Sequence, residues 1–158
     1  IQMQNKLLDS KVFPGKLNMS ISYTMSVNRF IDFTNDSNTY DGNYLPGIPN
    51  QLANFQLTWS LFNFIEFYYG LHYSGNQYLN DSNSMKYEDY YISDIKASAK
   101  IRISKNGKLN IYIGVNNLSD AHYASMLVVN AIGFGNSEPR YYYPGLPRNI
   151  YAGIRFGF

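Results

Sequence analysis

The sequence contains no cysteine, which excludes a disulfide framework and any metal site with thiolate ligands. Charged residues are also scarce, because they make up only 15% of the 158 residues, whereas an average soluble domain has about 25%. The net charge is +2 and Lys and Arg are not clustered along the chain, so nothing indicates nucleic-acid binding. A chain of this length usually forms one domain, and we treat residues 1–158 as a single unit.

Long apolar runs are missing as well. The longest candidate, Phe62–Tyr73, is interrupted by Glu66 and His72 and is shorter than the roughly 18–20 residues of a membrane-spanning helix. The first residues, IQMQNKLLDSK, lack the apolar core and cleavage site of a signal peptide. We therefore expect either a mature protein or a piece of a longer one, and any membrane crossing is expected to use strands.

Aromatic residues are abundant, with 16 Tyr and 10 Phe, and many lie in segments of alternating polarity. In Leu17–Val27, apolar side chains such as Ile21 alternate with polar ones such as Ser20 and Ser22. A period of two residues indicates a strand with two unlike faces. The same alternation predicts strands near residues 1–7, 17–27, 53–59, 65–73, 94–103, 109–115 and 150–158.

The connections between these segments alternate between short and long. Short connections are expected at residues 9–16, 60–63 and 104–108. Long polar connections are expected at residues 32–50, 75–86 and 119–147. The last short connection contains Asn106-Gly107, a hairpin signal. This arrangement predicts an antiparallel up-and-down meander with tight turns at one rim and large loops at the other.

Periodicity alone leaves open which face of the sheet meets water. A soluble lipocalin-like binder would enclose the apolar face, whereas a membrane barrel turns it toward lipid and encloses a polar lumen. The polar positions between Leu17 and Val27 are Asn, Ser and Thr without a charge, whereas a soluble surface is about 25–35% charged. This composition favours the membrane barrel.

Aromatic residues gather near the expected strand ends, where their rings suit the headgroup zone of a membrane. They are Trp59, Phe62, Tyr73, Tyr78, Tyr87, Tyr90 and Tyr91. The chain also ends on Phe158 at an apolar position, as is typical of outer-membrane barrels. The sequence therefore predicts an all-β fold, an antiparallel up-and-down transmembrane β-barrel in contact with outer-membrane lipid.

Several motifs occur in a recognisable order. VNNLSDAHY (Val115–Tyr123) runs from a strand into Asn-Leu-x-Asp and a Tyr, with Ser119 where Phe is usual. YYYPGLPRNIYAGIRFGF (Tyr141–Phe158) holds a Pro-Gly-x-x-Arg segment and a last strand ending in Phe. Together with the Leu-Pro-x-x-Pro entry in residues 42–59 and the Tyr-x-x-x-Asp strand in residues 87–101, they resemble the C-terminal part of the barrel of TonB-dependent outer-membrane receptors, such as siderophore receptors.

The resemblance implies a barrel of 22 strands, of which residues 1–158 are expected to supply the C-terminal seven to eight. It also implies an N-terminal plug domain and a segment contacted by the TonB complex, and nothing in the sequence resembles either. The expected function is uptake of a scarce nutrient, most often a ferric siderophore or similar chelate, at the cell outer membrane. Two alternatives remain: a stand-alone eight-stranded structural barrel, and the soluble lipocalin-like binder.

Position by position, the resemblance carries over to seven residues, which are expected to be architectural. They are Asn117, Asp120, Tyr123, Pro144, Gly145, Arg148 and Phe158. Asn117 and Asp120 are expected to cap backbone groups where the strand ends, because short polar side chains bond neighbouring N–H groups in turns. Pro144 and Pro147 cannot donate to a ladder, so they are expected on the loop side of the last strand.

Catalytic and metal-binding chemistry has little support. His72 and His122 are the only histidines, and His72 is expected to hydrogen-bond on the polar face because no second ligand stands at metal-binding spacing. Ser119 and Ser125, near His122, are loop residues of a Ser-rich chain. We therefore predict that the protein is not an enzyme and has no catalytic residues, no metal site and no cofactor.

The last long loop offers a possible ligand contact. Its Arg140 presents a guanidinium fork that suits carboxylate or chelate oxygens, and neighbouring aromatic rings suit stacking. The candidates for contact with a small-molecule chelate are His122, Arg140, Tyr141, Tyr142 and Tyr143. The alternative is that the three Tyr form only an interfacial belt.

Overall fold

Seven strands form one antiparallel sheet. The computed structural model describes residues 2–7, 14–35, 37–133 and 135–158. The strands are β1 (Gln2–Leu7), β2 (Lys16–Met25), β5 (Gln51–Leu61), β6 (Ile65–Ser74), β9 (Tyr90–Arg102), β10 (Lys108–Asn116) and β13 (Asn149–Gly157). The predicted strands are thus confirmed, with ends shifted by a few residues. Part of the short connection expected at residues 9–16 lies outside the described residues. Within the described ranges, no helix is long and apolar enough to cross a bilayer.

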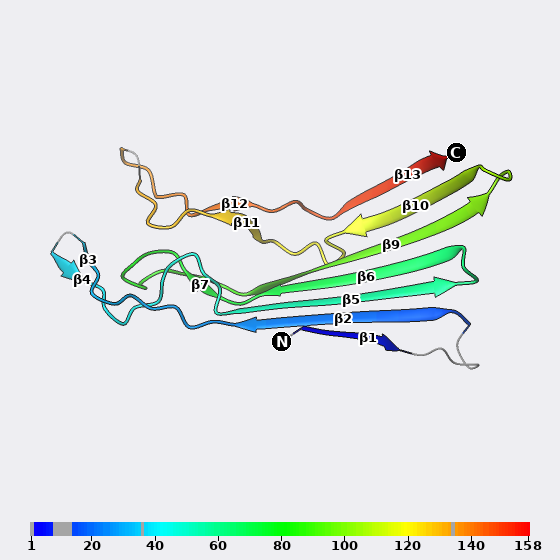
Figure 1. Ribbon diagram of the computed structural model, residues 1–158. Helices are drawn as coiled ribbons and strands as arrows, with labels where there is room; N and C mark the ends of the chain where they lie inside the picture. The colour runs from blue at the N-terminus through cyan, green and yellow to red at the C-terminus, as the bar shows by residue number, and fades with distance from the viewer. Residues whose placement is uncertain (1, 8–13, 36, 134) are drawn as a thin grey trace.

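The strand order is β1-β2-β5-β6-β9-β10-β13, so each strand pairs with the next sheet strand along the chain. All six pairings are antiparallel. Tight turns lie at one end of the sheet, the turn end, and the long connections lie at the other, the loop end (Figure 1). This is the predicted up-and-down topology, with β1 and β13 as its two edges.

The tight turn between β5 and β6 has a backbone conformation that its sequence does not predict. Phe62 and Asn63 have φ values of 49° and 60°, and the Phe64 N–H donates to the Leu61 carbonyl over 3.1 Å. Two successive residues with positive φ match a type I′ hairpin turn, which usually holds Asn-Gly or Gly-Gly. The antiparallel pairing therefore imposes a conformation that Phe62 alone disfavours.

The Asn-Gly signal locates the β9–β10 turn but not its form. Neither Asn106 nor Gly107 has a positive φ. The turn closes instead through the Ile103 N–H, which donates to the Gly107 carbonyl over 3.0 Å. The Gly107 N–H in turn donates to Ser104 Oγ over 2.8 Å.

One face of the sheet, the apolar face, is formed by odd-numbered residues of β2, β5, β6, β9 and β10 and by even-numbered residues of β13. Many of its large side chains are exposed, with Ile113 at 54% and Ile150 at 73% of full exposure. The only buried hydrophobic residues in the described ranges are Leu79 and Ala124, and both lie outside the seven-stranded sheet. The apolar face is therefore not the wall of a sealed interior, which argues against the lipocalin-like alternative.

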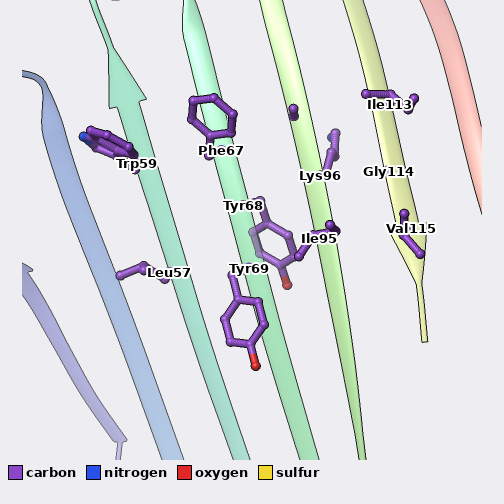
Figure 2. Close-up of a pocket in the computed structure, with 11 residues that line it drawn as sticks. Leu57, Trp59, Phe67, Tyr68, Tyr69, Ile95, Lys96, Ile113, Gly114 and Val115 are labelled. Atoms are coloured by element: carbon purple, nitrogen blue, oxygen red, sulfur yellow. The ribbon is translucent and has the colours of Figure 1, made fainter. Parts of the chain in front are cut away.

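A shallow hollow of about 500 Å³ interrupts this face. In the ladder, the small Ala97 lies between Phe67 and Ile113, and the larger side chains form the rim. Figure 2 shows Trp59 and Phe67 on neighbouring strands at one side of the hollow and Ile113 at the other. A small residue between large ones thus makes the surface uneven without making it polar.

The opposite face, the polar face, interlocks tyrosine with glycine. Tyr112 of β10 lies opposite Gly153 of β13, and Gly114 lies opposite Tyr151. A Cβ added to either glycine would collide with the partner's ring. The two rings also contact each other at a tilt, with centroids 6.3 Å apart. Glycine is therefore needed here for close approach of an aromatic ring rather than for a special backbone angle.

The three long connections contain short hairpins. They are β3 (Thr34–Asn35) with β4 (Asn38–Thr39), β7 (Gln77–Tyr78) with β8 (Lys86–Tyr87), and β11 (Ala124–Leu127) with β12 (Tyr142–Pro144). The middle connection binds the other two. Asn83 bonds both the N–H and the carbonyl of Tyr44 through its side chain, over 2.7 and 2.8 Å. On the other side, Asn130 accepts from the Asp81 N–H over 3.0 Å and donates its own N–H to the Leu79 carbonyl over 2.8 Å.

Candidate functional site

A hydrogen-bonded joint, centred on Asn117, closes the loop end between β10 and β13. The Asn117 side chain is 2% exposed. Its Nδ2 donates to the carbonyls of Ala121 and Leu146 over 2.9 and 3.1 Å, and its Oδ1 accepts from the Ala121 N–H over 2.8 Å. Its own N–H donates to Asp94 Oδ1 over 2.9 Å. The side chain of Asn117 thereby joins the two ends of the last long loop, and its backbone N–H ties them to β9.

Asp120, three residues after Asn117, and Arg148, directly before β13, extend the joint. Asp120 Oδ1 accepts from the Arg148 N–H over 2.8 Å, and the two side chains form an ion pair of 3.6 Å. Both side chains are partly exposed, so we ascribe the stabilisation mainly to the backbone bond rather than to the ion pair, because exposed ion pairs contribute little.

The ring of Tyr123 lies against Gly145. The Gly145 N–H donates to the Tyr123 carbonyl over 2.6 Å, and a Cβ on Gly145 would overlap the ring. Asn117 and Asp120 have φ values of 51° and 54°, a region that Asn and Asp enter more readily than other L residues. The motif residues Asn117, Asp120, Tyr123, Gly145 and Arg148 therefore share one joint, which we call the rim joint.

An aromatic cluster stands beside the rim joint, on the polar-face side. Tyr90 and Tyr123 are stacked with centroids 5.5 Å apart, and Tyr87 contacts both Tyr90 and Tyr142, at 6.1 and 5.8 Å. His72 completes the group at 6.4 Å from Tyr90. The rings of the cluster come from strands β6 and β9, from β8 in the second long connection, and from β12 and the segment after β10 in the third. The second and third long connections therefore both contribute to it.

The hydroxyl of Tyr87 is less accessible to water than that of a tyrosine on the surface. Burial raises the pKa of its hydroxyl above the usual 10.0. A backbone group of Ala124 acts in the opposite direction, and the neighbouring hydroxyls of Tyr90 and Tyr142 add to the rise. Tyr87 therefore stays a neutral hydrogen-bonding group throughout the physiological pH range.

A second hollow, of about 560 Å³, lies in the last long connection. It is lined by Arg140, Tyr142 and Tyr143 together with Ser137, Glu138 and apolar residues. Tyr142 thus belongs to both the hollow and the aromatic cluster. Arg140 would present its guanidinium to an anionic or chelating group there, with two aromatic rings beside it.

Of the remaining candidates, His122, Tyr141 and Phe158 lie apart from these features, whereas Pro144 also lines the second hollow and His72 belongs to the aromatic cluster. His122 is exposed, and Tyr141 contributes its carbonyl, which accepts from the Val128 N–H over 2.8 Å. Pro144 lies in β12, where its carbonyl accepts from Ser125 Oγ over 3.2 Å. Phe158 is fully exposed beyond the end of β13. His72 Nδ1 bonds Asn54 Oδ1 over 2.8 Å, and no group of three or more His, Asp or Glu in the described part of the chain is placed to hold a metal.

Sequence reasoning treated Tyr87, Tyr90 and Tyr91 alike, as belt residues, and it missed the cluster. Tyr91 lies opposite Tyr73 on the apolar face, whereas Tyr90 lies opposite Ser74 on the polar face. The alternation within β9 held this information, because Tyr90 has the parity of the polar residues Asp94 and Lys96. The membership of Tyr87 depends on the loop fold and had no local signal.

Comparison with known proteins agrees with this architecture. Residues 5–118 match the family described as TonB dependent receptor-like, beta-barrel. No curated protein matches the sequence.

Solved structures with the same fold include three iron-related receptors. The siderophore receptor PiuA from Acinetobacter baumannii has a TM-score of 0.69 and 20% identity, over 98% of this chain and 20% of that protein. For BauA, the ferric preacinetobactin receptor of the same species, the values are 0.70 and 13%, over 98% and 21%. For Fiu, a ferric-catecholate import receptor from E. coli K12, they are 0.66 and 17%, over 99% and 20%.

The chain therefore spans about a fifth of the length of these structures. At such low identity the likeness concerns the fold, a section of an antiparallel barrel wall with external loops. The family match covers well over half of the chain. Together with the seven-stranded meander and its unlike faces, it shows that this chain belongs to the TonB-dependent receptor-like β-barrel family.

Proposed function

We propose that this chain forms part of the barrel wall and outer loops of an outer-membrane receptor that takes up a ferric siderophore or similar chelate. The observation that carries the proposal is the convergence, at the loop end, of the aromatic cluster and the Arg140 hollow, joined through Tyr142. Aromatic rings and a guanidinium together suit a chelate with planar rings and negative oxygens. Two receptors of similar fold are described as a siderophore receptor and a ferric preacinetobactin receptor, which supports the same ligand class here.

The apolar face supports an outer-membrane location. Exposed side chains such as Ile113, Ile150 and Phe67 are costly in water but favourable against hydrocarbon. The family consists of receptors of this kind, so a role in binding and transport is favoured over catalysis.

The two sheet edges support a larger barrel. Among the described residues, β1 and β13 each have only one neighbouring strand in the sheet, and in lipid each unpaired N–H or carbonyl costs several kcal/mol. We propose that residues 1–158 are one portion of a barrel domain whose further strands pair with these edges. The plug and the segment contacted by the TonB complex would belong to polypeptide outside this chain.

Ligand binding at the loop end can be tested with two substitutions. Tyr142→Ala removes the ring shared by the cluster and the hollow, and Arg140→Gln removes the cation. We expect each to weaken binding of a ferric chelate by about ten-fold or more, equivalent to about 1.4 kcal/mol, in a fluorescence-quenching titration of the intact receptor. Tyr91→Ala is the matched control, because Tyr91 faces the apolar side. Equal affinities in all three variants would contradict this site.

A further inference from the structure

The hollow of the apolar face follows one strand, β9. On this face β9 is small at two successive positions, Ala97 and Ala99. Their neighbours in the ladder, on β6 and β10, are all large: they are Ile65, Phe67, Ile111 and Ile113. Small residues along one strand between large residues on both sides form a channel parallel to that strand. We call the low stretch over Ala97 and Ala99, which includes the hollow, the alanine groove.

The alanine groove is apolar. Leu57, Trp59 and Val115 line the hollow beside the ladder neighbours of Ala97 (Figure 2). Lys96 borders the hollow as well, but its ammonium group lies 5.5 Å from the ring centroid of Tyr112, which belongs to the polar face. Within the described residues, the charge nearest to the groove is therefore turned to the other side of the sheet. An occupant of the groove has to be hydrocarbon over most of its length.

The length of the groove matches one leaflet of a membrane. Along β9 it is bounded by two large residues, Ile95 toward the loop end and Ile101 toward the turn end. The stretch between them spans roughly 20 Å at the usual rise of a strand. A strand tilt of about 45° converts this length into a depth of roughly 14 Å, about half of a hydrocarbon core of about 30 Å. Because Ala97 and Ala99 lie nearer to Arg102 than to Tyr90, this half belongs to the leaflet at the turn end.

The width of the groove excludes a helix as its occupant. Neighbouring strands lie about 4.8 Å apart, so roughly 10 Å separate β6 from β10, and the side chains of both strands narrow this space further. An α-helix with its side chains is about 10–12 Å across and cannot reach the alanines. An unbranched acyl chain carries only hydrogen atoms on its carbons, so it is thin enough to lie between the two rows.

We propose that the alanine groove holds one unbranched acyl chain of a phospholipid from the leaflet at the turn end. The hydrophobic effect gives no preference here, because the chain is surrounded by hydrocarbon in either place. The preference comes from dispersion contacts with the groove walls, which are lost if the groove stays unfilled. The inference rests on the proposed membrane location, and it goes beyond ligand uptake because it assigns the barrel wall a lipid bound at a defined place.

Trp59 can report the occupant, because it is the single Trp of the chain and lines the hollow. The protein is placed in phosphatidylcholine vesicles with a rising fraction of a phosphatidylcholine that carries a dibrominated, unbranched chain, which quenches Trp fluorescence. The signal is the difference between the protein and its Trp59→Phe variant, so any other Trp of the receptor cancels. We expect half-quenching of the parent at a fraction about four-fold lower than that of Ala97→Phe, which fills the groove, because a few dispersion contacts give a preference of this size.

Ala152→Phe is the matched control. Ala152 lies on the apolar face in the same ladder row, on the far side of Ile113, and it does not line the hollow. The substitution adds the same ring at the same depth without filling the groove. Its half-quenching fraction should differ from that of the parent by less than about 1.5-fold. If Ala97→Phe does not fold, as judged by circular dichroism, Ala97→Leu takes its place.

Two competitors identify the chain and its source. Unbrominated phosphatidylcholine with unbranched chains should restore the fluorescence, whereas diphytanoyl phosphatidylcholine, whose chains carry methyl branches, should restore clearly less. Lipopolysaccharide added to the leaflet at the loop end should restore none.

Equal half-quenching fractions in the parent, Ala97→Phe and Ala152→Phe overturn the proposal but leave the lipid-facing assignment intact. Recovery of fluorescence with lipopolysaccharide also overturns it, as does recovery at higher protein density in the vesicles, which would place a second copy of the protein in the groove. If brominated lipid quenches Trp59 in none of the proteins, the proposed membrane location fails. Ligand binding at the loop end is tested separately by Arg140→Gln and Tyr142→Ala.

Discussion

The two faces of the sheet are made by alternate residues of the same strands, yet they are built in different ways. The apolar face presents large exposed side chains around a hollow that lies over Ala97. The polar face is held together by specific contacts, such as Tyr112 over Gly153 and Asn54 with His72. The apolar face therefore depends on the solvent that covers it, whereas the polar face depends on its own neighbours.

This difference predicts unequal tolerance to substitution. On the apolar face polarity should matter more than shape, because lipid adapts to shape but does not solvate charge. On the polar face shape should matter more than polarity, because rings fill spaces that only glycine leaves open.

The largest effect is expected from a charge on the apolar face. Ile113→Arg places a guanidinium at mid-strand of β10, and we expect a loss of about 2–4 kcal/mol in the free energy of unfolding. Urea unfolding in lipid vesicles, followed by the fluorescence of the single Trp, measures it. Tyr112→Arg, one residue away on the polar face, should cost clearly less; an equal cost would contradict the assignment of the faces.

A smaller effect is expected from volume on the polar face. Gly153→Val drives a side chain into the ring of Tyr112, and overpacking of this kind costs about 1–3 kcal/mol. Ala152→Val, on the apolar face of the same strand, should be close to neutral in the same unfolding assay. Equal changes in the free energy of unfolding for the two variants would show that the Tyr–Gly contacts do not contribute to stability.

Loss of a single polar contact should have a smaller effect again. Asn54 donates to Ser22 Oγ over 3.3 Å and bonds His72 over 2.8 Å. Asn54→Ala should reduce the free energy of unfolding by about 0.5–1.5 kcal/mol, the usual net value of a hydrogen bond. If Asn54→Ala lowered the free energy of unfolding more than Gly153→Val does, polar contacts would matter more than shape on this face, which contradicts our expectation.

The smallest effect concerns Tyr87 at the loop end. Because burial raises its pKa above 10.0 in the folded state, the unfolded chain loses this proton at lower pH than the folded chain does. Its contribution to stability is complete below about pH 10 and declines as the pH rises through the folded pKa. Ultraviolet titration should show one late phenolate fewer in Tyr87→Phe than in the parent; identical titration of the two proteins would contradict the burial.

Much of the fold could be predicted because its signals are local. Alternation over about ten residues, as in Leu17–Val27, predicts a strand whichever strand it pairs with. The absence of charge at the polar positions of this segment indicated that the opposite, apolar face meets lipid. The form of the Phe62-Asn63 turn was not predictable, because the pairing of β5 with β6 imposes it against local preference. The motif pattern placed Asn117 and Asp120 at the strand end, but their convergence with Gly145 and Arg148 depends on how a long loop returns.

The strands, their two unlike faces and the family can be predicted from the amino-acid sequence, since each depends on the spacing of neighbouring residues. Which distant side chains act together depends on how the strands pair and how the loops fold. Phe67, Ala97 and Ile113 lie far apart in the sequence, yet antiparallel register brings them to one groove. Tyr87, Tyr90, Tyr123 and Tyr142 likewise meet only because two long loops fold over the same strand ends. The spacing of residues along the chain gives information on one strand at a time. A site in a sheet combines residues from several strands, and the hydrogen-bond register between those strands determines which residues meet.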